Sequence, residues 1–205
     1  LNVRVDAPNP PPEYSGSLLV TPNHISWLDI FVVSLFYPSS FIAMKELAGW
    51  PLIGAAVRNA GTVFIDRSNR KDIDPITAAM SETLKAGGNV CFFPEARTSL
   101  GNGVLPLKAA LFQAAINSGC AVQPVAMRYY ADGRRTEAVS FAHVGLIRSL
   151  WQVVSLPEIR VSVDIPPPLL PQEVQHKHRF EIKDSVQAYL SAQVLADSPA
   201  PERLL

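Results

Sequence analysis

The chain has 205 residues, enough for one well-packed domain and few for two. Hydrophobic residues make up 48% and charged residues 18%, which excludes disorder for most of the chain. The 18 basic and 18 acidic residues leave no net charge, which argues against a nucleic-acid-binding protein with a broad basic surface. The low charge and a mean hydropathy of +0.14 suit a peripheral membrane protein.

Predicted strands and helices alternate along the chain. The opening residues 1–6 alternate like a strand, and apolar runs predict further strands at 17–21, 41–44, 62–66, 89–93, 121–127 and 159–165. Helices are predicted at 26–37, 51–60, 75–86, 107–119 and 179–196. Asp74 and Pro75 are expected as the N-cap and first residue of the third helix.

Most of the predicted strands are continuous apolar runs without two-residue alternation, which is typical of strands covered on both faces. We therefore predict the α/β class, with a mostly parallel sheet flanked by helices. No linker or composition change divides residues 1–205, so a single domain is expected. The apolar segment 143–156 is expected to pack in the core; the alternative is a membrane-interface helix with Trp151 as anchor and Arg148 near head groups.

The chain has two cysteines, Cys91 and Cys120, both in apolar runs, and we expect buried free thiols in a reducing compartment. No apolar stretch approaches the roughly 20 residues that span a bilayer. Because the chain begins with Leu rather than Met, we expect that upstream residues were removed, and any N-terminal membrane anchor or signal would lie among them.

Three polar clusters follow predicted strands: NHISWLD after 17–21, DRSNRKD after 62–66 and PEARTS after 89–93. In parallel α/β sheets, ligands bind beyond the carboxyl ends of the strands. We therefore expect the three clusters to converge on one active site.

His24 and Asp29 are the candidate proton-transfer pair of the first cluster. Five residues apart, they cannot share a helix face, but they can meet if His24 lies in the turn before a helix and Asp29 in its first turn. Imidazole titrates near neutral pH, so a histidine oriented by a carboxylate can take a proton from an alcohol. Alternatively, Ser26 and Asp29 form a capping box and Asp29 only satisfies backbone N–H groups. The two interpretations of Asp29 are compatible.

No G-x-S-x-G elbow is present and neither cysteine has a nearby histidine, so no protein nucleophile is evident. In the second cluster, Arg67 suits recognition of a phosphate or carboxylate; the alternative is a surface arginine paired with an aspartate. In the third, Glu95 and Arg97 can hold a polar head group or form a surface pair.

Four blocks follow one another along the chain: NHxxxxD, GTVFIDR, FPExxxS and a VQPVA strand. With these blocks in this order, the sequence resembles the 1-acylglycerol-3-phosphate acyltransferase family over about residues 15–130. The resemblance implies a glycerolipid acyltransferase-like α/β domain at the cytoplasmic face of the membrane, peripheral or anchored by the removed segment. It implies transfer of a fatty acyl group from acyl-CoA or acyl-carrier protein to a lysolipid hydroxyl, with no metal or other cofactor. His24 would be the general base and Asp29 its orienting carboxylate, while Arg67 and Glu95 would bind the acceptor.

The third block departs from the family pattern Phe-Pro-Glu-Gly-Thr-Arg-Ser. Ala96 replaces a glycine, so a backbone with positive φ at this position would be strained. The arginine has moved by one place, so the usual contact is not assumed for Arg97.

Several functions are consistent with these residues. The leading hypothesis is acylation of 1-acylglycerol-3-phosphate to phosphatidic acid, and the alternative acceptor is a lyso-ornithine lipid. A non-catalytic lipid-binding protein on the same fold and a thioester hydrolase are hypotheses of other classes.

Overall fold

The computed structural model describes residues 2–9, 11–44, 63–65 and 73–198. The strands are β1 (Asn2–Asp6), β2 (Leu18–Pro22), β3 (Ser40–Met44), β4 (Val63–Ile65), β5 (Val90–Cys91), β6 (Ala121–Ala131), β7 (Arg134–Arg135) and β8 (Glu158–Asp164). The helices are α1 (Leu28–Phe36), α3 (Ile73–Lys85), the 3-10 helix η3 (Ala110–Phe112), α4 (Gln113–Ser118), α5 (Leu146–Ser155), α6 (Pro171–Gln175) and α7 (Arg179–Leu195).

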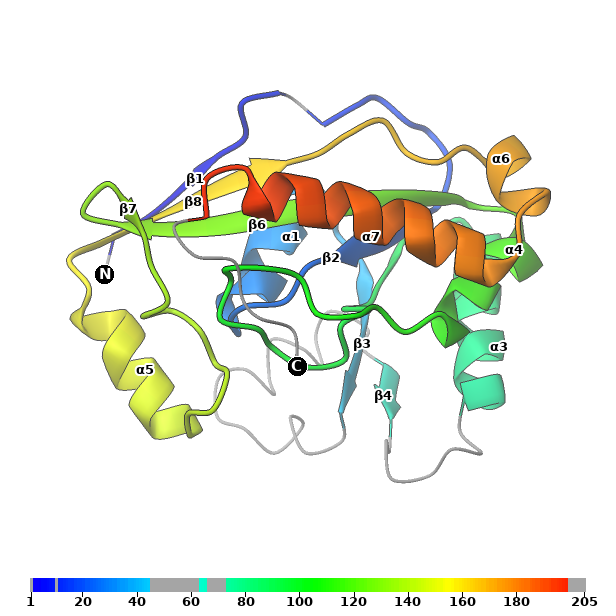
Figure 1. Cartoon of the computed structure of the whole chain (residues 1–205). Helices are drawn as coiled ribbons and strands as arrows, with labels where there is room; N and C mark the ends of the chain where they lie inside the picture. Colours follow the sequence, from blue (N-terminus) through cyan, green and yellow to red (C-terminus); the bar gives the residue numbers. More distant parts are fainter. Residues whose placement is uncertain (1, 10, 45–62, 66–72, 199–205) are drawn as a thin grey trace.

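The described strands form one eight-stranded sheet with the order β1-β8-β6-β2-β5-β3-β4, and β7 pairs with β6 (Figure 1). From β6 to β4 all neighbours are parallel. β8 is antiparallel to β6 and parallel to β1. The predicted class, a mostly parallel α/β sheet flanked by helices, is therefore confirmed.

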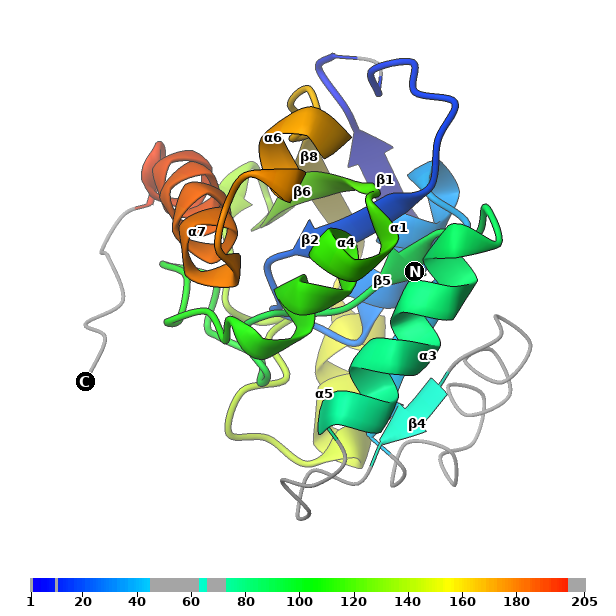
Figure 2. The same cartoon turned by 90° about the vertical axis from the view of Figure 1, so that its right-hand side faces the viewer.

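The sheet has a hydrophobic cluster on each side because its buried strands alternate their side chains between the two faces. On one side, Leu19 and Val122 pack with apolar residues of α3, α4, α6 and α7. On the other side, Val20 and Val125 pack with α1 and with Val153 of α5. Figures 1 and 2 show α7 and α1 on opposite sides of β2 and β6.

α7 illustrates how periodicity builds one of these clusters. Ile182, Val186, Leu190 and Val194 recur every four residues and are completely buried. The helix begins after His178, whose backbone N–H donates to the Glu181 carboxylate at 2.7 Å. This is the Glu half of a capping box.

Some predicted elements need correction. α3 begins at Ile73, so Asp74 is a residue of its first turn and not the N-cap. The helix predicted at 107–119 is shorter: η3 begins at Ala110 and α4 ends before Gly119, whose φ of 67° closes the helix in a left-handed conformation. The helix predicted at 51–60 lies outside the described residues.

Sequence analysis did not predict the hairpin between β6 and β7. Asp132 and Gly133 form its two-residue turn with φ angles of 50° and 73°, the left-handed pair that an Asp-Gly dipeptide favours. In the part of the chain that the structure describes, no helix is long and apolar enough to cross a lipid bilayer.

The expectation that segment 143–156 packs in the core is wrong for three of its large side chains. In α5, Ile147, Trp151 and Val154 are 84%, 74% and 58% exposed. The helix instead buries Ser149 and Val153, each 0% exposed. Its apolar face therefore points away from the protein.

Candidate active site

The NHxxxxD segment connects β2 to α1 and begins with a buried asparagine. The Asn23 side chain accepts from the backbone N–H of Met127 at 2.7 Å and donates to the Met127 carbonyl at 3.0 Å. Its amide thus pairs with β6 as a further strand residue would. This pairing fixes the chain at the carboxyl end of β2, directly before His24.

His24 and Asp29 meet as their sequence spacing allows. His24 lies in the turn before α1, and Asp29 is the second residue of that helix. The His24 Nδ1 atom is 2.8 Å from the Asp29 Oδ2 atom. The chain reversal at the start of α1 therefore forms the pair.

Asp29 is completely buried and its carboxylate is held by several further donors. The backbone N–H groups of Ile25 and Ser26 donate to Oδ2 at 2.7 and 2.9 Å. The Tyr129 hydroxyl donates to Oδ1 at 2.6 Å. Asp29 therefore satisfies backbone N–H groups and contacts His24 at the same time. The expected capping box is not formed, because Trp27 is the N-cap of α1 and no side chain caps it by a hydrogen bond. The role of the pair in proton transfer stays a prediction.

These contacts define which nitrogen of His24 carries the proton. An ionised carboxylate can only accept hydrogen bonds, so we infer that Nδ1 is the N–H donor to Asp29. Nε2 then keeps its lone pair, and 20% of the His24 side chain is exposed. The ring stacks on Phe93, with centroids 3.9 Å apart and planes 19° apart. A fixed imidazole with a free lone pair is the arrangement of a general base.

Tyr129 is a residue of the site that sequence analysis missed. Burial, followed by the charge of Asp29 and the hydrogen bond to it, raises the pKa of the Tyr129 phenol well above its ordinary value. The hydroxyl therefore stays protonated and remains a donor to Asp29. No local pattern marks Tyr129, because it is separated from Asp29 by 100 residues and lies within an apolar strand.

The first and third polar clusters come together. Glu95 is 3% exposed, and its two carboxylate oxygens accept from the backbone N–H groups of His24 at 2.6 Å and Leu105 at 2.8 Å. The Ser99 N–H donates to the His24 carbonyl at 2.8 Å. The third cluster therefore fixes the backbone of His24, and this role for Glu95 was not predicted.

The remaining site predictions have different outcomes. Ala96 has a φ of 64°, so the positive φ that would strain a residue with a Cβ is present at this position. Arg97 is exposed, and its assignment to the acceptor stays a prediction, as does that of Glu95. Arg67 and the rest of the second cluster lie outside the described residues.

Neither cysteine is suited to be a nucleophile. Cys91 is 0% and Cys120 4% exposed. Burial, and then the negative charge of Asp29, raises the pKa of the Cys91 thiol well above its ordinary value. Burial likewise raises the pKa of Cys120. Both thiols are therefore neutral and inaccessible in the folded chain, as the sequence predicted for buried cysteines.

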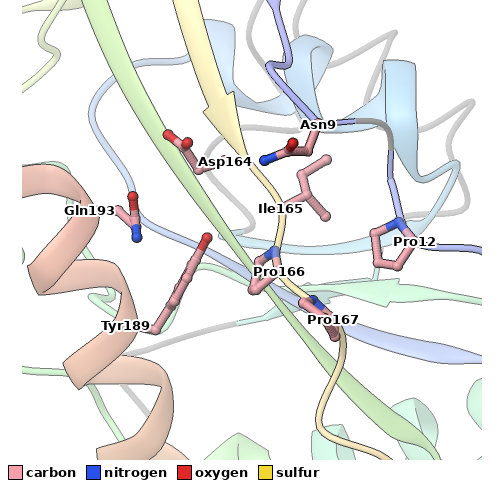
Figure 3. Close-up of a pocket in the computed structure, with 8 residues that line it drawn as sticks. All are labelled: Asn9, Pro12, Asp164, Ile165, Pro166, Pro167, Tyr189 and Gln193. Carbon is pink, nitrogen blue, oxygen red and sulfur yellow. The ribbon is translucent and has the colours of Figure 1, made fainter.

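A hollow of about 400 Å³ lies apart from these residues, between the N-terminal connector, the segment after β8 and α7 (Figure 3). It is lined by Asn9, Pro12, Asp164, Ile165, Pro166, Pro167, Tyr189 and Gln193. None of the residues of the NHxxxxD or FPExxxS motifs lines it. Among the described residues, no group of three or more His, Cys, Asp or Glu side chains is placed to hold a metal ion.

The structure thus combines a mostly parallel α/β sheet with an oriented histidine at the carboxyl end of one strand, where such folds bind their ligands. The sequence matches the Acyltransferase family over residues 2–128. The chain belongs to this family and is an acyltransferase, which confirms the prediction from its motifs.

Individual relatives agree with this assignment. The chain is 47% identical to the 1-acyl-sn-glycerol-3-phosphate acyltransferase of Neisseria gonorrhoeae, over 97% of this chain and 77% of that protein. It is 37% identical to the lyso-ornithine lipid O-acyltransferase of Pseudomonas aeruginosa, over 57% of this chain and 45% of that protein.

A solved structure shares the fold. The crystal structure of the 1-acyl-sn-glycerophosphate acyltransferase of Thermotoga maritima matches with a TM-score of 0.68 and 23% identity, over 97% of this chain and 73% of that one.

Proposed function

We propose that the chain transfers a fatty acyl group from an acyl thioester to the free hydroxyl of 1-acylglycerol-3-phosphate, giving phosphatidic acid. In this proposal His24 is the general base and Asp29 orients it. Arg67, Glu95 and Arg97 belong to the acceptor site. The donor is acyl-CoA or acyl-carrier protein, and the reaction needs no metal or other cofactor.

The reaction balances without a covalent enzyme intermediate. His24 Nε2 takes the proton of the acceptor hydroxyl as its oxygen attacks the thioester carbonyl carbon. The carbon–sulfur bond then breaks, the ester is released, and the imidazolium returns the proton to the leaving thiolate. Asp29 stabilises the imidazolium between these two steps.

One observation carries this proposal: the buried carboxylate of Asp29 holds His24 through Nδ1, so the Nε2 lone pair does not point at Asp29, while the buried thiols stay neutral. A base without a protein nucleophile favours attack by the substrate's own hydroxyl. The same geometry argues against a lipid-binding protein without activity, because such a protein needs no oriented base.

The relatives favour the phosphate-bearing acceptor. The similarity to the N. gonorrhoeae enzyme extends over almost the whole chain, whereas the similarity to the lyso-ornithine lipid enzyme covers about half of it. Because the acceptor is an amphiphile, we also propose that the chain works at a membrane surface, on its cytoplasmic face where acyl thioesters are made.

The proposal is tested by acyl transfer from radiolabelled acyl-CoA and acyl-carrier protein, each offered with lysophosphatidic acid and with lyso-ornithine lipid. Labelled phosphatidic acid is the expected product. His24→Ala should lower its rate by about 10²- to 10⁴-fold, because general-base catalysis is lost. His176→Ala, which removes an exposed histidine at the end of α6, is the matched control and should behave as the parent.

Three outcomes would contradict parts of the proposal. Product with lyso-ornithine lipid alone would replace the acceptor and keep the mechanism. Free fatty acid formed regardless of acceptor would indicate thioester hydrolysis. Lysolipid binding without any product would favour the hypothesis of a non-catalytic lipid-binding protein and overturn the role of His24 as general base.

A further inference from the structure

α5 has an apolar face that the protein leaves uncovered. Ile147, Trp151 and Val154 follow one another at four- and three-residue spacing, so they share one side of the helix. Their exposed fractions are 84%, 74% and 58%. The opposite side of the helix holds it to the sheet through Val153, which is completely buried. We call Ile147, Trp151 and Val154 the outer face of α5.

The outer face belongs to a segment that is tied to the candidate active site. The Trp27 indole N–H donates to the buried Ser149 hydroxyl of α5 at 3.2 Å. Trp27 is three residues after His24 in the sequence. The loop before α5 is also attached there, since the Phe141 N–H donates to the Ile25 carbonyl at 2.9 Å. The position of α5 therefore determines how His24 lies relative to any surface that the helix contacts.

The segment around α5 has a basic residue and no acidic one. Between residues 143 and 157 the chain has no Asp or Glu, and Arg148 is its single Lys or Arg. Arg148 is exposed and lines a shallow hollow with Ile147 and Trp151. A tryptophan and aliphatic side chains beside an arginine suit the boundary between acyl chains and anionic head groups.

The size of the outer face argues against a protein partner. A stable protein interface commonly takes about 800 Å² and some 20 to 30 residues from each partner. α5 has 10 residues, of which three present large apolar side chains to solvent. A bilayer needs no such complementary area, because a helix can place its apolar side chains among acyl chains one by one.

From these observations we propose that the outer face of α5 docks the enzyme on an anionic lipid bilayer, with the helix lying in the plane of the interface. This inference rests on the proposed function, because a lysolipid acceptor resides in that bilayer. Docking through α5 holds the His24 segment at the membrane surface, so the acceptor hydroxyl reaches Nε2 without its acyl chain leaving the lipid. Arg148 adds attraction to anionic head groups.

Binding to vesicles tests this inference without relying on activity. The chain and its Ile147→Ser/Trp151→Ser double variant are sedimented with vesicles of equimolar phosphatidylcholine and phosphatidylglycerol. The double variant should partition about 10- to 100-fold less, because two large apolar side chains no longer leave water. Phe180→Ser is the matched control: Phe180 is 52% exposed on α7, and its loss should leave partitioning unchanged.

Two further arms define the contact. Lipids brominated on their acyl chains should quench the fluorescence of the parent, and Trp151→Phe should remove most of this quenching while binding persists. Arg148→Gln should weaken binding to the anionic vesicles by about fivefold and leave binding to pure phosphatidylcholine unchanged.

The activity readout separates this inference from the proposed function. With a short-chain, monomeric lysophosphatidic acid the double variant should turn over like the parent, whereas with vesicle-borne acceptor its rate should fall with its binding. If the parent makes no ester with any acceptor, the proposed function fails, and vesicle binding still tests whether α5 is the docking face.

Equal partitioning of the parent and the double variant overturns the proposal that α5 is the docking face. A concentration-dependent dimer in the ultracentrifuge that the double variant loses, without vesicle binding by the parent, also overturns it in favour of a second copy.

Discussion

α7 and α5 are both amphipathic helices, but their apolar sides face opposite surroundings. In α7, Ile182, Val186, Leu190 and Val194 point at the sheet and are completely buried. In α5 the large apolar side chains point at solvent, and the helix is attached through Ser149 and Val153. Periodicity reveals an apolar stripe in both helices, but only tertiary structure shows what covers it. The difference separates a helix that stabilises the fold from one that presents a surface.

The two sides of the sheet also differ, in the polar groups that they bury. The side of α3, α4, α6 and α7 is an apolar cluster. The side of α1 and α5 contains a second cluster and also the completely buried polar residues Asn23, Ser26 and Asp29. Buried polar groups persist only when they are hydrogen-bonded, so this side is specified by named contacts rather than by apolar area alone.

The largest expected effect on stability contrasts the two helices directly. Leu190→Ala should lower the free energy of unfolding by about 2–5 kcal/mol, because it leaves a cavity under α7. Trp151→Ser in α5 should change it by less than about 0.5 kcal/mol, because the side chain is exposed already. Urea unfolding of both variants measures the difference. Comparable losses in the two variants would contradict the claim that α7 stabilises the fold through its apolar side and α5 does not.

Two neighbouring tyrosines of β6, Tyr129 and Tyr130, point to opposite faces of the sheet, so replacing each tests one face. Tyr129→Phe removes the hydroxyl that donates to Asp29, and should cost about 1.5–3 kcal/mol of unfolding free energy because a buried carboxylate loses a donor. The turnover number should fall about tenfold with an unchanged KM, since His24 is then less well oriented.

Tyr130→Phe is the control for that variant. Its hydroxyl donates instead to Asp197, which is more exposed, so stability and turnover should stay close to those of the parent. Equal turnover in the Tyr129 and Tyr130 variants would show that Tyr129 does not position the pair.

Ala96→Gly tests the departure from the family pattern in the third block. The φ of 64° is unfavourable for a residue with a Cβ, so glycine should relieve about 1 kcal/mol of strain, less the entropy that glycine adds to the unfolded chain. The expected result is an unfolding midpoint equal to or slightly above that of the parent. A clear loss of stability would mean that the Ala96 methyl group packs favourably enough to outweigh its strain.

Replacing Asp197, which follows the C-cap residue of α7, should have a small effect on the free energy of unfolding, and this effect should depend on pH. Burial alone raises the pKa of Asp197, but the hydrogen bond from Tyr130 and the charges of Arg135 and Arg128 outweigh it and hold the pKa below its ordinary value. A depressed carboxyl pKa stabilises the fold above the unfolded-state pKa, and this contribution is lost as pH falls through the folded-state pKa.

The Asp197→Asn variant should therefore lose less than about 1 kcal/mol at neutral pH, because the pair is partly exposed. Urea unfolding from neutral to acidic pH should bring the two proteins together at the acidic end. A difference that grows toward low pH would contradict the assignment.

Many helices and strands could be predicted from the sequence, because each is marked by a pattern within its own segment. Apolar runs at 17–21 and 121–127 predicted strands of the sheet, and the four-residue recurrence in 179–196 predicted α7. The contact between His24 and Asp29 was also predictable, since both residues belong to one turn and the helix that follows it.

The remainder depends on contacts between distant residues. Tyr129 and Glu95 act on the His24 segment from other parts of the chain, so no spacing reveals them. The exposure of Trp151 was not predictable either, because an apolar stripe with a tryptophan has the same sequence pattern whether protein or lipid covers it. The family pattern places a glycine at position 96, but only the structure shows that φ is positive there.

The most direct test of the central claim, that Asp29 serves His24 in catalysis besides holding the backbone, is acyl transfer by Asp29→Asn. The amide oxygen of asparagine can still accept from the Ile25 and Ser26 N–H groups, so the variant should remain folded, with a loss of stability no larger than that of Tyr129→Phe. The charge that stabilises the imidazolium is lost, so we expect phosphatidic acid formation to fall by about 10²- to 10⁴-fold. A folded variant with a rate within about threefold of the parent would contradict a catalytic role for Asp29 and leave it with its structural role alone.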